Sequence, residues 1–368
     1  MGQQYLSYFA GAKDKKPGHI ISLPFREDPS KTEAIDILAK RCIDISKQDW
    51  DDYETSWEFK SHTLVLLNHE SLLYDAYQKM AAIKGQFFDE IRESEEKINK
   101  LFAEIFDVED EVECQVKCED VTISVAKIKT AVESFISYAI GCMFGRYSLD
   151  VEGLVYAGGE WDVSKYRSYP ADTDNIISIC EDEYFEDDIV GRFVKFIETV
   201  YGLEFLEENL KFIADALGGT GTSREVIRKY FLNDFYNYHC STYSVTGSGK
   251  RPIYWLFDSG KKNGFKALIY MHRYQPDTIA RMRTDYVHEQ QERYRTAIAH
   301  LEERINNVPT SERVKLNRQL SKLKDQDTEI RVYEEKMHHL ADQMICIDLD
   351  DGVKKNYEIF KDVLAKIN

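Results

Sequence analysis

The sequence predicts a predominantly helical α+β fold, in which a helical spacer, a small β-containing domain and a long antiparallel helical hairpin follow one another. Apolar residues recur every three or four positions over most of the chain, which indicates amphipathic helices. One stretch instead has two short apolar runs on either side of an Asn-Gly pair, which is typical of a β-hairpin. Towards the C-terminal end, one proline separates two long helical patterns, so two antiparallel helices are expected there.

The first part of the chain is predicted to mix one helix with short extended pieces. Residues 31–46 carry apolar positions at helical spacing, whereas 19–25 (HIISLPF) and 63–67 (TLVLL) are expected to be extended. We therefore expect a connecting subdomain over residues 1–70.

A helical spacer is expected over 71–147. Residues 70–106 contain few glycines and no proline, and their apolar residues predict one or two long helices that end before the acidic run VEDEVE. The segment 123–147 begins with helical spacing and becomes apolar on every face, so it should be buried.

The β-containing domain is expected over 148–276. Its loop GGTGTSRE leads into a helix, for which Thr222 or Ser223 is a suitable N-cap. Further on, a two-residue turn at Asn263-Gly264 would place Lys261 directly opposite Lys266. Facing like charges are unfavourable, and either a phosphate bound between them or a longer loop would remove the conflict.

The helical hairpin is expected over 277–346, with a separate C-terminal segment over 347–368. Apolar residues recur every three or four positions in 277–306 and again in 316–344, as in a coiled coil, although Asp327 interrupts the second pattern. Arms of this length would extend about 45 Å at ~1.5 Å per residue.

The charge of the chain is unevenly distributed. The formal net charge is -17, yet residues 247–283 hold eight Lys or Arg and only two acids. Residues 172–208 show the reverse, with twelve acids and two bases, and are expected to form a solvated helical face that repels DNA. A basic, aromatic segment within an acidic chain indicates contact with an anionic partner.

Composition excludes several classes of protein and site. Seven scattered cysteines fit a reducing cytoplasm better than a disulfide framework, and no apolar run reaches the ~18 residues of a membrane span, so a soluble cytoplasmic protein is expected. Cys114 and Cys118 are close together, but no second Cys or His pair completes a zinc site, so no metal is expected.

No complete catalytic motif is present. TGSGKR (246–251) imitates a phosphate-binding loop, but Arg251 stands where Ser or Thr should hold magnesium. The order Asp51, Asp52, Glu58, Lys60 is that of many metal-dependent nucleases, in which carboxylates hold magnesium and lysine steadies the phosphate. Such groups arise often by chance in a chain so rich in charge, and no catalytic residue is assigned.

Four longer phrases carry a resemblance to a known family. FISYAIGCMFGRYSLDVEGLVYAGGEWD (135–162), KRPIYWLFDSGKKNGFKALIYMHRYQPDT (250–278) and IDLDDGVKKNYEIF (347–360) resemble the C-terminal part of the PglX family, the adenine-specific DNA methyltransferases of bacterial BREX phage-defence systems. DWDDYETSWEFKSHTLV (49–65) is similar to the segment that follows the catalytic domain there and in related fused restriction-modification enzymes.

This resemblance implies a target-recognition domain between the helical spacer and the C-terminal helical region. Double-stranded DNA, the methyltransferase half and other BREX subunits are the implied partners, with no membrane. S-adenosylmethionine is the cofactor expected in the parent enzyme, but this chain has neither the Gly-rich cofactor motif nor Asn-Pro-Pro-Tyr/Phe. We therefore expect a truncated, split or excised C-terminal part, with recognition and without cofactor, chemistry or catalytic residues of its own.

The residues expected to contact DNA lie in the basic segment, with Arg favoured over Lys for reading bases. They are Lys250, Arg251, Lys261, Lys262, Lys266 and Arg273. Two alternatives remain. The chain would otherwise be a protein-interaction scaffold for other BREX subunits, with an incidental basic stretch, or a magnesium-dependent nuclease that uses Glu58 and Lys60.

Overall fold

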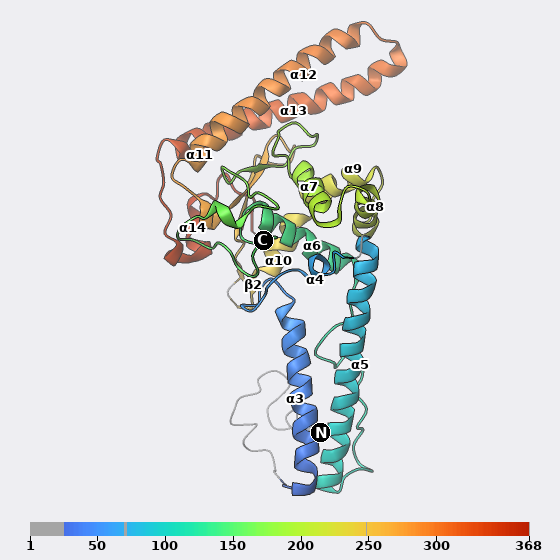
Figure 1. Cartoon of the computed structure of the whole chain (residues 1–368). Coiled ribbons are helices and arrows are strands. Elements are labelled where there is room, and N and C mark those ends of the chain that lie inside the picture. Colours follow the sequence, from blue (N-terminus) through green and yellow to red (C-terminus); the bar gives the residue numbers. More distant parts are fainter. Residues whose placement is uncertain (1–25, 70–71, 248, 368) are drawn as a thin grey trace. The chain divides into compact units, whose positions relative to one another are not determined.

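The computed structural model describes residues 26–69, 72–247 and 249–367. It is mostly helical with a small antiparallel sheet, so the predicted α+β fold class is confirmed (Figure 1). The chain forms two compact units. Unit 1 combines the described residues of Met1–Trp57 with Tyr77–Lys127, and unit 2 combines Glu58–Ala76 with the described residues of Ile128–Asn368.

Unit 1 is built on two long helices, α3 (Pro29–Asp51) and α5 (Leu73–Phe106), of which α5 contributes the residues from Tyr77 onward. They run antiparallel, because ion pairs join positions that rise along α3 to positions that fall along α5: Lys31–Glu104, Arg41–Glu90 and Asp49–Lys84. Ile45 and Ile91 are buried together with Val121 and Ile123 from the segment that follows α5. The helix predicted over 31–46 is thus present and longer, and the long helix predicted over 70–106 is continuous.

The two extended pieces predicted in the first 70 residues have different outcomes. Residues 19–25 lie outside the described residues. The prediction for 63–67 is wrong, because Thr63–Leu66 forms a short helix, α4. His62 explains the difference, since its Nδ1 accepts a hydrogen bond from the Leu64 backbone N–H (3.2 Å) and caps the helix start.

Unit 2 contains a layer of helices around the apolar helix α6 (Ile128–Met143), which is buried as predicted. Three helices pack against it, α7 (Ile189–Tyr201), α8 (Leu206–Leu217) and α10 (Phe235–Thr242), and α9 (Ser223–Asn233) packs against these three. Thr222 is the N-cap of α9 and forms a reciprocal capping box with Glu225, which confirms the predicted loop-to-helix boundary.

The sheet of unit 2 is small and antiparallel. Its strand order is β1 (Ile177–Ser178), β5 (Lys266–Tyr270) and β4 (Tyr254–Asp258), and a separate ribbon pairs β2 (Ser244–Val245) with β3 (Gly249–Lys250). The short helical turns η1 (Val163–Lys165) and η2 (Met271–Arg273) lie before β1 and after β5. Apart from Asp258, every residue of β4 and β5 is buried.

The β4–β5 connection differs from the predicted two-residue turn. Asp258 pairs with Lys266, so residues 259–265 form a seven-residue loop, in which Asn263 adopts a φ of 55°. The predicted opposition of Lys261 and Lys266 is therefore wrong, and an acid and a base stand opposite each other instead. Of the two alternatives, a phosphate bound between the lysines or a longer loop, the chain adopts the longer loop.

The predicted helical hairpin is present in unit 2 (Figure 1). Its first arm begins with α11 (Thr278–Arg281) and a π-helical turn, η3 (Met282–Val287), and continues as α12 (His288–Asn306). The second arm is α13 (Thr310–Ala341), and the C-terminal segment holds η4 (Leu349–Asp351) and α14 (Gly352–Ile359). The base of the hairpin shares one apolar core with the sheet, to which Trp255, Ile330 and Phe360 contribute.

None of the helices in the described part of the chain is both long and apolar enough to span a membrane.

Candidate nucleic-acid interface

The six predicted contact residues divide between the two ends of the β4–β5 pair. The pairing runs from Tyr254 opposite Tyr270 to Asp258 opposite Lys266, a length of about 14 Å at ~3.4 Å per residue. Lys261, Lys262 and Lys266 lie at the loop end. Lys250, Arg251 and Arg273 flank the other end. The two ends differ in how far their charge is already neutralised.

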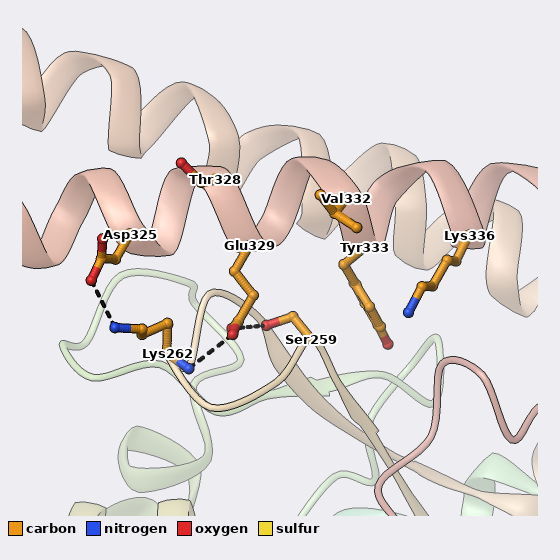
Figure 2. Close-up of a pocket in the computed structure, with 8 residues that line it drawn as sticks. All are labelled: Ser259, Lys262, Asp325, Thr328, Glu329, Val332, Tyr333 and Lys336. Carbon is orange, nitrogen blue, oxygen red and sulfur yellow. Dashed lines mark hydrogen bonds and ion pairs between the residues drawn. The ribbon is translucent and has the colours of Figure 1, made fainter.

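At the loop end, one carboxylate of α13 holds the backbone of the β4–β5 loop (Figure 2). Glu329 accepts hydrogen bonds from the Ser259 hydroxyl (2.8 Å) and from the backbone N–H groups of Lys262 (2.9 Å) and Gly264 (3.0 Å). The Lys262 ammonium lies 2.8 Å from a carboxylate oxygen of Asp325, one turn earlier on α13. The loop is therefore tied to the hairpin, and much of its positive charge faces acids.

The other two lysines of the loop end lie in contrasting environments. Lys266 is buried, and its ammonium donates to the Leu232 carbonyl (3.0 Å) and lies 3.7 Å from Asp258, so it points away from solvent. Lys261 is exposed and forms no ion pair with a described residue. Of the three, Lys261 alone presents an unneutralised ammonium to solvent within the described structure.

The pocket beside this loop has a volume of about 380 Å³. Its lining includes two lysines, Lys262 and Lys336, and two acids, Asp325 and Glu329 (Figure 2). Balanced charges give such a pocket no preference for an anion.

At the opposite end, Lys250 and Arg251 follow the β2–β3 turn. Lys250 is half-buried at the end of β3, and Arg251 is exposed, with its backbone N–H donating to the Tyr243 carbonyl (2.7 Å). Neither side chain forms an ion pair with any residue that the structure describes. Both charges are therefore available to a partner.

Arg273 lies on an aromatic ring at the same end. Its guanidinium carbon is 4.0 Å from the centre of the Trp161 ring, and its terminal nitrogens donate to the carbonyls of Phe144 and Thr173 (3.3 Å each). Burial lowers the pKa of Arg273 from its usual value, and no described carboxylate lies within ion-pair distance. Its position is thus fixed without a direct ion pair, and the charges of Asp172 and Asp174 act on it from farther away.

Arg146 joins this group, and sequence reasoning missed it. Its Nε and Nη1 donate to the hydroxyls of Tyr147 and Tyr270 (3.1 Å each), and the rings of Tyr147 and Tyr243 lie 5.3 and 5.9 Å from its guanidinium carbon. The signal was a single cation at the end of the apolar run FISYAIGCMFGRY. Arg146, Lys250, Arg251 and Arg273 are called the cationic surface below.

Contacts connect the members of the cationic surface. Tyr243 contacts the Arg146 guanidinium through its ring and accepts from the Arg251 backbone through its carbonyl. The Tyr270 hydroxyl also accepts a hydrogen bond from Arg146, and Tyr270 is three residues before Arg273 in the chain. These two tyrosines therefore link Arg146 to the segments that carry Arg251 and Arg273.

The acidic segment 172–208 is only partly the solvated face that its sequence predicts. Asp188 is buried, caps α7 through the backbone N–H of Val190, and forms a two-pronged ion pair with Arg228 (2.7 and 2.8 Å). Asp172 is buried as well, and its carboxylate lies 3.3 Å from the Arg192 guanidinium. Part of this acidic charge is therefore structural.

Three acids of this segment form the group with metal-ligand spacing in the part of the chain that the structure describes. One oxygen from each of Asp172, Asp174 and Asp187 lies within 4.8 Å of the others. The Tyr286 hydroxyl lies within hydrogen-bonding distance of both Asp174 (2.9 Å) and Asp187 (2.5 Å), which occupies these carboxylates internally. Lys60 of the nuclease pattern lies 3.6 Å from Glu152, and Glu58 belongs to no such group among the described residues.

Comparison with known proteins shows that the chain is homologous to adenine-specific methyltransferases. It is 38% identical over 362 residues to the adenine-specific methyltransferase PglX of Lacticaseibacillus casei (strain Zhang). It is 37% identical over 368 residues to the adenine-specific methyltransferase BrxX of Escherichia coli O9:H4 (strain HS). No protein-family model matches the chain.

The matches cover nearly all of this chain and a smaller share of its relatives. They include 96% and 92% of the chain but 30% of the PglX and BrxX proteins. The predicted resemblance to the PglX family is confirmed, and the coverage is consistent with a C-terminal part of these proteins.

Proposed function

We propose that this chain is the DNA-binding and target-recognition portion of a BREX adenine-N6 DNA methyltransferase. The chain would position duplex DNA, and a catalytic domain that lies elsewhere in the relatives' length would transfer the methyl group from S-adenosylmethionine. The homology to PglX and BrxX supports the reaction class, since both are named adenine-specific methyltransferases. The proposal for this chain rests on its own surface.

The observation that carries the proposal is the unneutralised charge of the cationic surface. Two of its four cations, Arg146 and Arg273, lie on aromatic rings, and none of the four has a carboxylate within ion-pair distance among the described residues, in a chain whose formal net charge is -17. Phosphate contacts by Arg and Lys supply most of the sequence-independent affinity for DNA. Arg also pairs with guanine through two parallel hydrogen bonds, which offers a means of reading sequence.

The loop end of β4–β5 is the weaker candidate for the same role. Lys262 faces Asp325, Lys266 is buried, and Glu329 adds a further negative charge beneath the loop. The ends are about 14 Å apart, which exceeds the Debye length of ~8 Å at physiological salt, so each end acts with its own local charge.

Duplex binding at about 50 and 200 mM salt tests the proposal. Four phosphate contacts predict roughly a 100-fold loss of affinity over this range, at ~0.9 units of log-log slope per phosphate. The double variant Lys250→Glu with Arg251→Glu should weaken binding and reduce the slope by about two.

The matched control is Lys261→Glu with Lys262→Glu, which makes the same change in net charge at the loop end. We expect it to retain most of the affinity, because the loop end contributes Lys261 alone. Equal loss in both variants would show that net charge, rather than this surface, governs binding. Absence of binding by the unmodified chain at both salt concentrations would refute the proposal in favour of a protein-interaction scaffold.

A further inference from the structure

Arg146 carries a positive charge in a position where burial is costly. It directly follows the buried segment that ends at Gly145, and it is itself only partly exposed. None of the carboxylates in the described residues lies within ion-pair distance of it. Placing a charged group in a low-dielectric region without an opposite charge is unfavourable, so a counter-ion from outside the chain would offset this cost.

The guanidinium has unused hydrogen-bonding capacity. Of its five N–H groups, Nε–H donates to Tyr147 and one Nη1–H donates to Tyr270. The Tyr270 hydroxyl in turn donates to the Tyr156 carbonyl (2.9 Å), which fixes the orientation of the phenol. Within the described residues Nη2 has no hydrogen-bond partner, so the planar edge between Nη1 and Nη2 is available for a two-pronged contact with an oxyanion.

His239, which lies in the field of Arg146, adds no positive charge to its surroundings. His239 is fully buried, and its Nε2 accepts hydrogen bonds from the backbone N–H groups of Ile253 and Tyr254 (3.1 Å each). The proton of the neutral ring is therefore on Nδ1, which has no partner among the described atoms. Burial and the charge of Arg146 lower the pKa of His239 to about 3, so this ring is neutral at physiological pH.

The ring of Tyr243 connects these groups. It lies 4.8 Å from the His239 ring and 5.9 Å from the Arg146 guanidinium carbon, measured from the centre of the phenol ring. His272 also lies in the field of Arg146, and burial together with that charge lowers its pKa to about 4. Neither histidine therefore adds to the positive charge that Arg146 shares with the other members of the cationic surface.

We propose that Arg146 anchors a binding site for one phosphate group, and that in the DNA complex this group is a phosphodiester of the backbone. A phosphate offers the two oxygens that the free edge of the guanidinium requires. Lys250, at the end of β3, and Arg251, which follows it, supply further cations for neighbouring phosphates of a strand. The identification of this phosphate as part of DNA rests on the proposed function. The binding of a phosphate group is inferred from the environment of Arg146 alone.

The test compares the unmodified chain with Arg146→Gln and Arg146→Lys. Duplex binding is measured between about 50 and 200 mM salt, and one lost phosphate contact should reduce the log-log slope by ~0.9 in Arg146→Gln. We expect its affinity to fall about tenfold or more, since hydrogen bonds between charged groups are stronger than neutral ones. Arg146→Lys should keep the slope and lose part of the affinity, because it retains the charge and lacks the fork.

A second arm uses inorganic phosphate alone and separates this inference from the proposed function. If the unmodified chain does not bind duplex DNA, the proposed function fails. A rise in its melting temperature with phosphate that Arg146→Gln lacks would then identify a site for free phosphate. If phosphate does not raise the melting temperature of the unmodified chain, the phosphate site is overturned as well. Circular dichroism verifies that Arg146→Gln is folded. If the folded variant binds duplex DNA with an unchanged salt slope, the inference is overturned and the proposed function stands. If Arg146→Gln does not fold, an unchanged affinity of Arg146→Lys for duplex DNA would overturn the inference.

Discussion

Replacing Glu329 by alanine should release the β4–β5 loop from α13. The carboxylate accepts three hydrogen bonds, from the Ser259 hydroxyl and from the backbone N–H groups of Lys262 and Gly264. Gly264 is buried, so its N–H would lose its partner without full access to water. Gly260 also packs against this carboxylate, because a Cβ built on it would lie 2.7 Å from a Glu329 oxygen.

The magnitude depends on the number and type of these bonds. Hydrogen bonds to a charged group contribute roughly 1.5–3 kcal/mol each, but the partly exposed ones are replaced by water, so we expect a loss of about 2–4 kcal/mol for Glu329→Ala. Glu329→Gln keeps one carbonyl oxygen as acceptor and should lose about half as much. Asp325→Asn is the control, because its ion pair with Lys262 is about half exposed and should contribute less than ~1 kcal/mol.

Urea denaturation measures the change in unfolding free energy, and limited trypsin digestion reports on the loop itself. Trypsin cleaves after lysine, so release of the loop should accelerate cleavage after Lys261 and Lys262 in Glu329→Ala. A loss below about 0.5 kcal/mol together with unchanged cleavage would refute the role assigned to Glu329.

Three other perturbations probe unit 2 and unit 1. Arg228→Ala should cost about 3–5 kcal/mol in urea denaturation, because it leaves the buried carboxylate of Asp188 without its partner, and a loss under ~1 kcal/mol would contradict this. Burial raises the pKa of Asp172 to about 7, above its unfolded value of ~3.9. The folded state therefore binds this proton more tightly than the unfolded state, so stability should fall as pH rises from about 4 to 7. Asp172→Asn should make the fall in melting temperature over this range less steep. An equally steep fall in the variant would refute the assignment of this pH dependence to Asp172. Gly145→Ala should destabilise by several kcal/mol, since its φ is 75° and a Cβ would meet an aromatic side chain at 2.3 Å, whereas Gly85→Ala, in open space within α5, should stabilise by roughly 0.5–1 kcal/mol in thermal unfolding. Similar effects of the two glycine variants would contradict the described environments.

Periodic features were predictable because each depends on neighbours along the chain. The burial of α6, the start of α9 at Thr222 and the two arms of the hairpin all arise from spacing and capping residues within a few turns. The resemblance to PglX was likewise readable from long phrases. These predictions required no knowledge of which distant segments come together.

Two of the failures involve contacts between distant residues. The Asn263-Gly264 pair signals a tight turn, but Glu329, more than sixty residues later, supplies acceptors that hold a wider loop. Lys266 counts as a free cation in the sequence, yet the Leu232 carbonyl and Asp258 occupy its ammonium.

The candidate interface shows the same limit. The basic segment was identified from local charge, but the sequence does not say that β4 and β5 separate its cations into two groups. Arg146 lies more than 100 residues before Arg251, and only the fold brings Tyr243 beside it. Local charge along the chain therefore found three of the four members of the surface and missed Arg146.

Hydrogen–deuterium exchange with and without duplex DNA tests the central claim most directly. If DNA binds at the cationic surface, exchange should slow in the peptides that carry it, which cover 144–162, 243–254 and the turn η2, and the loop 259–265 should stay unchanged. Slower exchange confined to the loop, with no change at the cationic surface, would contradict this claim.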